Sequence, residues 1–380
     1  MKKEMYNEDL LFFRDSVKRF LKKEVIPFHE LWENRGIVPK DIWTKAGKAG
    51  LLGMTISKEY GGLGLKDFKY SCVLIEEIAK AGTSGLSFAL HNDVAIPYLE
   101  KYCNEEQKKR WFPKLISGEK ITALAMTEPG GGSDLKNIKT TAEDKGEYFL
   151  VNGSKTFITN GILGNLIITA VKTSSKEGGK GISLICIEDG MEGFEKGKNL
   201  KKIGLKAQDT AELFFKNVKV PKKNILGIEG EGFKYMMENL SQERLVIAVG
   251  ALGVVEEVLK YTTQYTLERM AFNQPIGKFQ NSRFKLAEMK TEAEIGRVFI
   301  DDCIELLNKK KLSSVKAAMA KYWATDLQVK TVDQCLQLYG GYGYMMEYEI
   351  ARAYIDSRVQ TIYGGTNEIM KEIIGRSMGL

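Results

Sequence analysis

The sequence predicts an α+β protein of three successive domains: an N-terminal α-helical domain, a middle β-barrel or β-sandwich domain, and a C-terminal four-helix bundle. The chain has 380 residues, which is more than a single hydrophobic core usually serves. Apolar residues recur at helical spacing toward both ends, whereas the middle consists of short β-rich runs divided by glycine and lysine turns. We expect the domains to cover residues 1–118, 119–226 and 227–380.

The N-terminal third contains several helical patterns. Leu10, Phe13, Val17 and Phe20 share one helical face, and residues 71–79 repeat the pattern. The glycine-rich run GGLGLKD that follows the first helices lacks the spacing of a dinucleotide-binding fingerprint and follows no clear strand. This run therefore predicts only a turn.

The middle third reads as β structure. Residues 147–161 (EYFLVNGSKTFITNG) predict two strands joined by a hairpin turn at Asn152-Gly153. Three further β-rich runs follow without intervening helices, so no Rossmann unit is expected. Helical periodicity returns after this region. Residues 232–270 predict one long helix, and three more helices are expected, with breaks near Pro275, Leu312 and Gly340.

The composition excludes several classes of function. The net charge of +7 is a mild excess without a long basic run, which argues against nucleic-acid binding. Five cysteines without a CxxC pair and only two histidines argue against a disulfide framework, a metal centre and a Ser-His-Asp hydrolase. No targeting segment and no apolar run long enough to span a bilayer is evident. We therefore expect a cytoplasmic protein, or a mitochondrial matrix protein if a transit peptide has been removed.

Two segments suggest chemistry from their residues alone. In MTEPGGGSD, residues 126–134, three consecutive glycines free the backbone to approach a ligand, and exposed N–H groups suit a phosphate or ring carbonyls. A mobile turn fits the same pattern. Glu243 lies on an apolar helical stripe, where burial raises a carboxyl pKa and suits a general base. An ion pair of Glu243 with Arg244 or a lysine is the structural alternative.

Two later segments also allow both a functional and a structural interpretation. Gly340-Gly341 and Gly364-Gly365 each lie beside aromatic residues, as around a flat cofactor, although helix C-caps give the same pattern. Arg269 and Gln280 flank a proline-containing turn. An arginine at this turn suits a pyrophosphate, but a solvated arginine without a ligand fits the sequence equally well.

Together, these segments resemble the acyl-CoA dehydrogenase family in the same order along essentially the whole chain. MTEPGGGSD resembles the first family signature, and the stretch from Gln337 through GGYGYMMEYEIARAYID resembles the second. The strings GLKAQDTAELFF, MAKYWA and VQTIYGGTNEIMKE are most like those of long-chain members. The resemblance implies the acyl-CoA dehydrogenase fold, noncovalently bound FAD and a step of fatty acid β-oxidation.

The resemblance also assigns residues by position. The flavin contacts that it implies are Leu124, Met126, Thr127, Gly132, Ser133, Phe157, Thr159, Arg269, Phe272, Phe279, Gln280, Gln337, Gly340, Gly341, Thr366 and Glu368. Phe157 and Thr159 match positions beside the flavin ring, and Phe157 replaces the tryptophan of many relatives. The contacts from Arg269 to Gln280 match residues that often serve a neighbouring subunit's cofactor. Residues implied to border the substrate are Ser133, Arg244, Gly364 and Gly365.

One departure from the family pattern decides the catalytic assignment. Many members carry their catalytic glutamate in a string like IYEGT, but this chain has IYGGT, with glycine at position 364. A minority, including long-chain and isovaleryl types, supply a glutamate from the middle helix just before an arginine, and Glu243-Arg244 occupies that place. The resemblance therefore implies that Glu243 is the base, and that the Gly364 backbone N–H and a flavin hydroxyl stabilise the thioester oxygen.

The implied reaction converts a straight-chain medium or long acyl-CoA to a trans-2-enoyl-CoA. Electrons are expected to pass to an electron-transfer flavoprotein, and the enzyme is expected to be a homotetramer, a dimer of dimers. The rival interpretations are a branched- or short-chain dehydrogenase, an oxidase of the same fold, and a noncatalytic acyl-CoA-binding protein. Nothing in one sequence determines the chain length.

Overall fold

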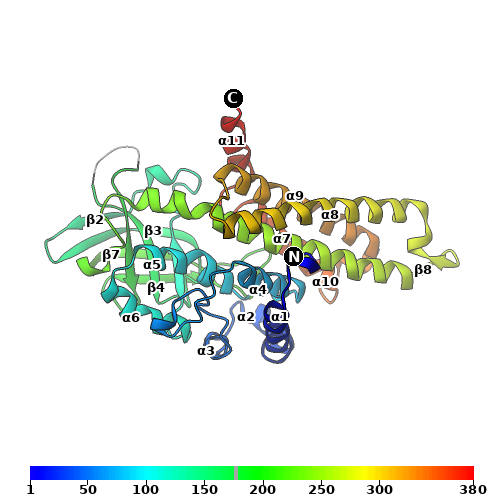
Figure 1. Ribbon diagram of the computed structural model, residues 1–380, viewed down its shortest axis with the longest axis horizontal. Helices are drawn as coiled ribbons and strands as arrows, with labels where there is room; N and C mark the ends of the chain where they lie inside the picture. Colours follow the sequence, from blue (N-terminus) through cyan, green and yellow to red (C-terminus); the bar gives the residue numbers. More distant parts are fainter. Residues whose placement is uncertain (175–178) are drawn as a thin grey trace.

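A computed structural model describes residues 1–174 and 179–380. A curled β-sheet lies at one end, and three long helices extend from it to the opposite end (Figure 1). The N-terminal helices are α1 (Glu8–Phe20), α2 (His29–Arg35), α3 (Asp41–Lys48), α4 (Lys69–Lys80), α5 (Ile96–Tyr102) and α6 (Glu105–Ile116). A π-helical turn, η5 (Leu90–Ala95), leads directly into α5. The helices predicted at the start of the chain and at residues 71–79 are confirmed as α1 and α4.

The middle segment forms one seven-stranded sheet. Its strands are β1 (Thr122–Ala125), β2 (Thr141–Asp144), β3 (Tyr148–Thr159), β4 (Leu166–Lys172), β5 (Ile182–Glu188), β6 (Phe194–Asn199) and β7 (Thr210–Pro221). The strand order is β1-β4-β2-β3-β7-β6. β5 lies off this path and pairs antiparallel with β4. β4 and β5 are apolar and almost wholly buried, as expected for strands that are covered on both faces.

The hairpin predicted at Asn152-Gly153 is wrong. β3 continues through both residues and pairs antiparallel with β7 along its length, with a register shift between Val151 and Gly153. Gly153 has φ +143°, and a Cβ there would lie 2.7 Å from Thr140. The glycine therefore permits a close approach of Thr140, the residue before β2, at a bulge, rather than a reversal of the chain.

The C-terminal segment is helical, as predicted. Its helices are α7 (Gly232–Glu268), α8 (Gln280–Asn308), α9 (Ser314–Tyr339), α10 (Glu349–Ser357) and α11 (Asn367–Ser377), with a small ribbon, β8 (Met270–Ala271) and β9 (Gln274–Pro275), between α7 and α8. The long helix is confirmed at 37 residues. The breaks near Pro275, Leu312 and Gly340 are also confirmed, but four helices follow α7 rather than three, because residues 358–366 interrupt the last one.

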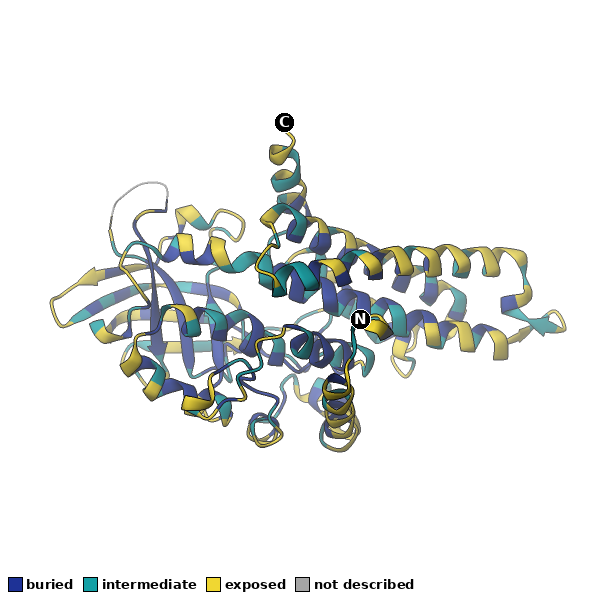
Figure 2. Ribbon diagram, in the orientation of Figure 1, coloured by how far each residue is buried: buried dark blue, intermediate teal, exposed yellow. Residues whose placement is uncertain are grey.

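Buried side chains connect the helical segments. Phe68, Cys72 and Ile75 from the region of α4 belong to the same apolar core as the inner faces of α7, α8 and α9. The buried stripe along these long helices and their exposed outer surfaces are visible in Figure 2. No helix in the described part of the chain is both long and apolar enough to cross a membrane.

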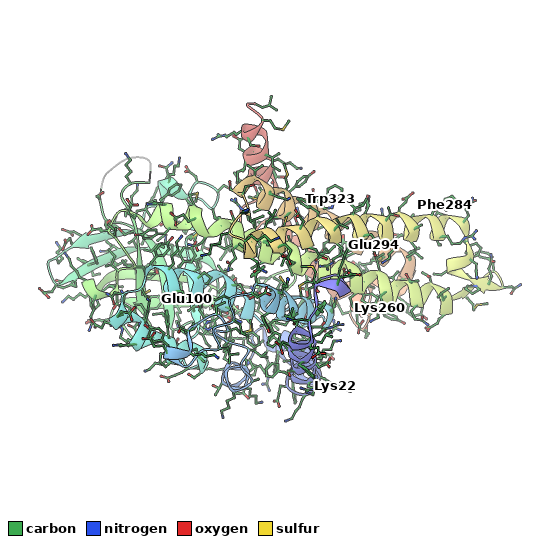
Figure 3. The ribbon with its side chains drawn as sticks, in the orientation of Figure 1. Lys22, Glu100, Lys260, Phe284, Glu294 and Trp323 are labelled. Atoms are coloured by element: carbon green, nitrogen blue, oxygen red, sulfur yellow. The ribbon has the colours of Figure 1, made fainter. Side chains whose placement is uncertain are left out.

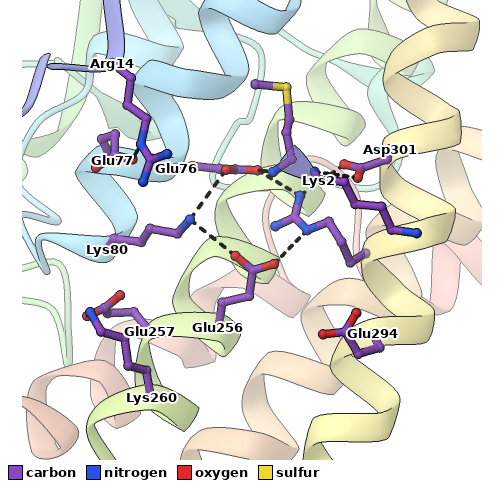
Figure 4. A network of polar contacts seen from close by, with 12 residues as sticks. Lys2, Arg14, Glu76, Glu77, Lys80, Glu256, Glu257, Lys260, Glu294 and Asp301 are labelled. Carbon is purple, nitrogen blue, oxygen red and sulfur yellow. Dashed lines mark hydrogen bonds and ion pairs between the residues drawn. The ribbon is translucent and has the colours of Figure 1, made fainter. Parts of the chain in front are cut away.

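A network of ion pairs joins α4, α7 and α8 (Figure 4). The Arg297 guanidinium donates to Glu76 at 2.8 Å, to Glu256 at 2.7 Å and to Asp301 at 3.3 Å. Lys80 lies 3.3 Å from Glu256 and 3.6 Å from Glu76. Arg297 and Glu76 are buried, so each charge requires the partners that surround it. The network therefore holds α4 against α7, and both helices contribute residues to the cavity described next.

Candidate active site

An apolar cavity of about 460 Å³ lies where the three segments meet. Its walls come from α4 and η5, from the loop after β1, from β3, from one face of α7 and from the region of α10 and the following turn. The volume is in the range of small-molecule sites, which are mostly apolar with a few placed polar groups. Of the residues assigned from the sequence, the following line it: Leu124, Met126, Thr127, Gly132, Phe157, Thr159, Glu243, Gly364 and Gly365.

Glu243 is the carboxylate on the α7 face of the cavity. Its side chain is buried, and burial raises its pKa to about 7, while a hydrogen bond from Tyr98 and the charge of Arg244 act in the opposite direction. The Tyr98 hydroxyl donates to Oε1 at 2.7 Å. No ion pair involves Glu243 among the described residues, so the alternative of a Glu243–Arg244 pair is not seen. A carboxyl with a pKa near neutrality, at the wall of an apolar cavity, has the properties of a general base.

The Gly364-Gly365 turn lies beside Glu243. Gly364 has φ +66°, and a Cβ there would lie 2.4 Å from Ile247 Cδ1, one helical turn after Glu243 on α7. This turn is held from behind, because Lys321 on α9 donates to the Gly365 carbonyl at 2.9 Å and to Asn367 Oδ1 at 2.8 Å. The lack of a side chain at position 364 leaves the backbone of the turn close to the base.

The β wall presents a flat aromatic group to the cavity. Phe157 has φ +58°, at a register shift between Lys155 and Ile158, and 69% of its surface is exposed. A non-glycine residue at positive φ is uncommon and costs energy, and such residues concentrate at functional sites. The bulge turns this ring into the cavity, where it supplies a face for a planar ring system.

A buried ion pair supports the glycine-rich loop that follows β1. Glu128 accepts from Lys155 Nζ at 2.8 Å and from the Thr140 hydroxyl at 2.6 Å, and Lys155 also donates to the Met126 carbonyl at 3.1 Å. Burial lowers the pKa of Lys155 to about 8, against the opposing effect of Glu128. Gly130 and Gly131 have no atom within 4 Å of the place where a Cβ would stand. The loop is thus anchored at its base, with an open glycine backbone at its tip.

A second hollow, of about 440 Å³, lies at the far end of the long helices. Four residues assigned from the sequence line it: Arg269, Gln337, Gly340 and Gly341. The Arg269 guanidinium lies 5.3 Å from the centre of the Tyr342 ring. Arg269 follows the last residue of α7, so it is about 39 Å along the helix axis from Glu243 at the 1.5 Å rise of an α-helix. The structure therefore does not bring the two groups of assigned cofactor residues together within one chain.

The remaining assigned residues line neither hollow. Ser133, Gln280 and Glu368 are exposed, and Phe272 is 90% exposed with its ring 6.1 Å from that of Phe279. Thr366 caps the N-terminus of α11 by accepting from the Ile369 N–H. Arg244, which follows Glu243 on α7, is buried, and within the described residues its Nε has no hydrogen-bond partner.

Sequence reasoning missed several supporting residues: Tyr98, Glu128, Lys155 and Lys321. Each acts through a hydrogen bond between distant segments, and Tyr98 is 145 residues from Glu243 in the chain. Neither a motif nor a periodicity marks Tyr98, which lies in the mixed apolar and charged segment IPYLEKY. Glu128 and Lys321 lie within the quoted strings MTEPGGGSD and MAKYWA, but nothing in those strings indicates their partners. Lys155, a lysine within a strand of buried residues, carried a signal of its own, because a buried lysine requires a partner.

The fold and the cavity together define a flavin-dependent dehydrogenase architecture, and the comparisons establish which one. Residues 7–119, 123–218 and 230–379 match the models for the N-terminal, middle and C-terminal domains of acyl-CoA dehydrogenases. The chain belongs to the acyl-CoA dehydrogenase family and is a flavin-dependent oxidoreductase with FAD as its cofactor.

Individual relatives agree with this assignment. The long-chain specific acyl-CoA dehydrogenase of Rattus norvegicus mitochondria is 48% identical over 368 residues, 96% of this chain and 85% of that protein. The crystal structure of an acyl-CoA dehydrogenase from Geobacillus kaustophilus has a TM-score of 0.98 and 48% identity, with complete coverage of both chains. The acyl-CoA dehydrogenase of Bacillus anthracis in complex with FAD has a TM-score of 0.91 at 30% identity, covering all of this chain and 69% of that one.

Proposed function

We propose that the protein converts straight-chain medium and long fatty acyl-CoA to trans-2-enoyl-CoA, with Glu243 as the base that removes the α proton. The observation that carries the proposal is the buried Glu243 carboxyl at the cavity wall beside the Gly364 turn. Glycine at position 364 has no side chain to accept a proton, and among the carboxylates that line the cavity Glu243 is the buried one, since Glu257, Glu349 and Asp356 are more exposed.

The residues of the β wall suit the flavin ring. Phe157, Thr159 and Gly132 of the glycine loop line the same cavity as Glu243 on α7. These residues would hold the flavin ring of FAD, which would supply the hydride acceptor for the β hydrogen. Glu243 would hold the α proton after transfer, and the Gly364 N–H would stabilise negative charge on the thioester oxygen. A bound acyl chain against the apolar part of the lining would displace water from the reacting atoms.

The length of the cavity supports a long acyl substrate. The residues of α7 that line it recur along one stripe, from Glu243 through Ile247, Gly250 and Val254 to Tyr261. Glu243 and Tyr261 are 18 positions apart, which is about 27 Å along an α-helix. With C–C bonds of about 1.5 Å, an extended acyl chain advances roughly 1.25 Å per carbon. The stripe therefore accommodates more than ten carbons beyond the base.

The proposed function is tested by mixing the purified flavoprotein anaerobically with saturated acyl-CoAs of increasing length. We expect the flavin absorbance to bleach, and kcat/KM to be higher for straight medium or long chains than for isovaleryl-CoA. A flavin that binds but is reduced by none of these thioesters would contradict a dehydrogenase. Rapid reoxidation by oxygen would identify an oxidase, and isovaleryl-CoA as the best substrate would overturn the assigned chain type.

We further propose one FAD per chain in a homotetramer, a dimer of dimers that reduces an electron-transfer flavoprotein in the cytoplasm. Glu243 and Arg269 line separate hollows about 39 Å apart along α7, which supports a neighbouring chain as the source of the Arg269 contact. Large apolar side chains also project outward from α8 and α9, among them Phe284 and Trp323 (Figure 3). The three segments 1–118, 119–226 and 227–380 would remain the domains of each subunit.

Arg269→Ala tests this assembly. We expect the variant to lose FAD on gel filtration, although position 269 is remote from Glu243, because a cation for the cofactor's pyrophosphate is removed. Lys260→Ala, at an exposed position on the same helix, is the control and should keep its flavin. A monomer with full FAD occupancy, or full retention by Arg269→Ala, would contradict the proposed arrangement.

A further inference from the structure

Tyr98 is hydrogen-bonded to the proposed base, Glu243. It lies on α5 with its side chain completely buried, and its hydroxyl donates to Glu243 Oε1 at 2.7 Å. Tyr98 does not line the cavity, so it touches neither substrate nor cofactor. We propose that Tyr98 is the positioning residue of the base, which orients the Glu243 carboxylate and favours its ionised form. This inference rests on the proposed role of Glu243.

The two carboxylate oxygens of Glu243 have different surroundings. Oε1 accepts the Tyr98 bond, whereas Oε2 has no hydrogen bond among the described residues and is not one of the fully enclosed polar atoms without a partner. The Tyr98 bond therefore restricts rotation of the carboxylate and leaves Oε2 directed to the cavity. A base that is held in one orientation loses less conformational entropy when it reaches the substrate proton. Orientation matters because small misplacements of reacting groups reduce rates strongly.

The backbone around Tyr98 determines where the hydroxyl lies. The π-helical turn η5 precedes α5 without a break, and its Asp93 carbonyl accepts from the Gln242 side chain at 2.8 Å. Gln242 immediately precedes Glu243 on α7. Two hydrogen bonds at neighbouring positions of α7, one donated by Gln242 and one accepted by Glu243, thus align η5 and α5 with the segment that carries the base.

Other ionisable groups do not replace this bond. Arg244 on α7 lowers the pKa of Glu243 by its charge, Asp93 on η5 is buried with its own pKa raised to about 7 by desolvation, and Lys321 on α9 is occupied by the Gly364-Gly365 turn. Burial also raises the pKa of Tyr98 far above neutrality. Tyr98 therefore remains a hydrogen-bond donor throughout the pH range of activity, and it does not compete as a proton acceptor.

The test is the pH dependence of anaerobic flavin reduction by a saturating long-chain acyl-CoA in Tyr98→Phe. Phenylalanine retains the ring but removes the donor, so the ionised form of Glu243 is less favoured. We expect the midpoint of the rate profile to rise by about one pH unit. The reduction rate should fall about tenfold below the midpoint and recover in part at high pH, with little change in substrate affinity.

Tyr102→Phe is the matched control. Tyr102 lies one turn later on the same helix, and its hydroxyl donates to Glu238 at an exposed position. Its profile should equal that of the unmodified enzyme. Fluorotyrosine at position 98 is the converse test, because it preserves packing and is a stronger donor, so the midpoint should move to lower pH.

The outcomes distinguish the inference from the proposed function. An unchanged midpoint in both Tyr98→Phe and the fluorotyrosine enzyme would overturn the positioning role, even if Glu243→Gln is inactive. Normal flavin reduction by Glu243→Gln would instead remove Glu243 as the base. Should Tyr98→Phe lose its flavin, the fluorotyrosine enzyme still decides: a lower midpoint supports the inference, and an unchanged one rejects it.

Discussion

Glu243→Gln is expected to slow flavin reduction by acyl-CoA at least about a thousandfold while the bound flavin spectrum persists. Glutamine preserves the shape of the side chain and still accepts a hydrogen bond from Tyr98, but its amide does not accept the α proton near neutral pH. General-base catalysis is typically worth ~10²–10⁴-fold, and the bound substrate would displace the water that could substitute for the carboxylate. Anaerobic stopped-flow absorbance of the flavin measures the effect.

Glu238→Gln provides the control for this experiment. Glu238 lies on the same helix, but it pairs with Lys101 and Tyr102 outside the cavity, so flavin reduction should be unchanged. Near-normal reduction by Glu243→Gln would show that another group removes the proton. Loss of FAD from that variant would instead make Glu243 a structural residue.

Gly250→Phe is expected to lower kcat/KM for long-chain acyl-CoA by about a hundredfold, with a much smaller effect on four-carbon substrates. Gly250 lines the cavity on the α7 stripe, two turns beyond Glu243. A Cβ at this position would lie 3.4 Å from Ile75 on α4, so larger groups must occupy the space assigned to the acyl chain. Discrimination in apolar pockets reaches about 10–200-fold for a single methylene, and an aromatic ring displaces several.

Gly250→Ala is the matched control, because one methyl group at 3.4 Å from its neighbour fits with little adjustment. Its ratio of long-chain to short-chain kcat/KM should stay close to that of the unmodified enzyme. Equal losses on both substrates in Gly250→Phe would indicate a general distortion of α7. An unchanged ratio would show that the acyl chain follows another path.

The order of helical and β segments could be predicted from the sequence because periodicity is a local property. The 37-residue helix α7 and the apolar strands β4 and β5 follow from the spacing of their own side chains. The Asn152-Gly153 pair misled the prediction, because the same dipeptide serves a hairpin turn and a bulge, and the choice depends on contacts with Thr140. A single sequence does not display such contacts.

The sequence by itself determined the family and the candidacy of Glu243, since motif order, the glycine at position 364 and an apolar stripe around a carboxylate are all readable in one dimension. Only the tertiary structure decided how the base is supported. Tyr98 reaches Glu243 across 145 residues, and Phe157 turns into the cavity at a bulge. The physical reason is that a buried polar group takes its pKa and its orientation from neighbours in space, and the fold chooses those neighbours.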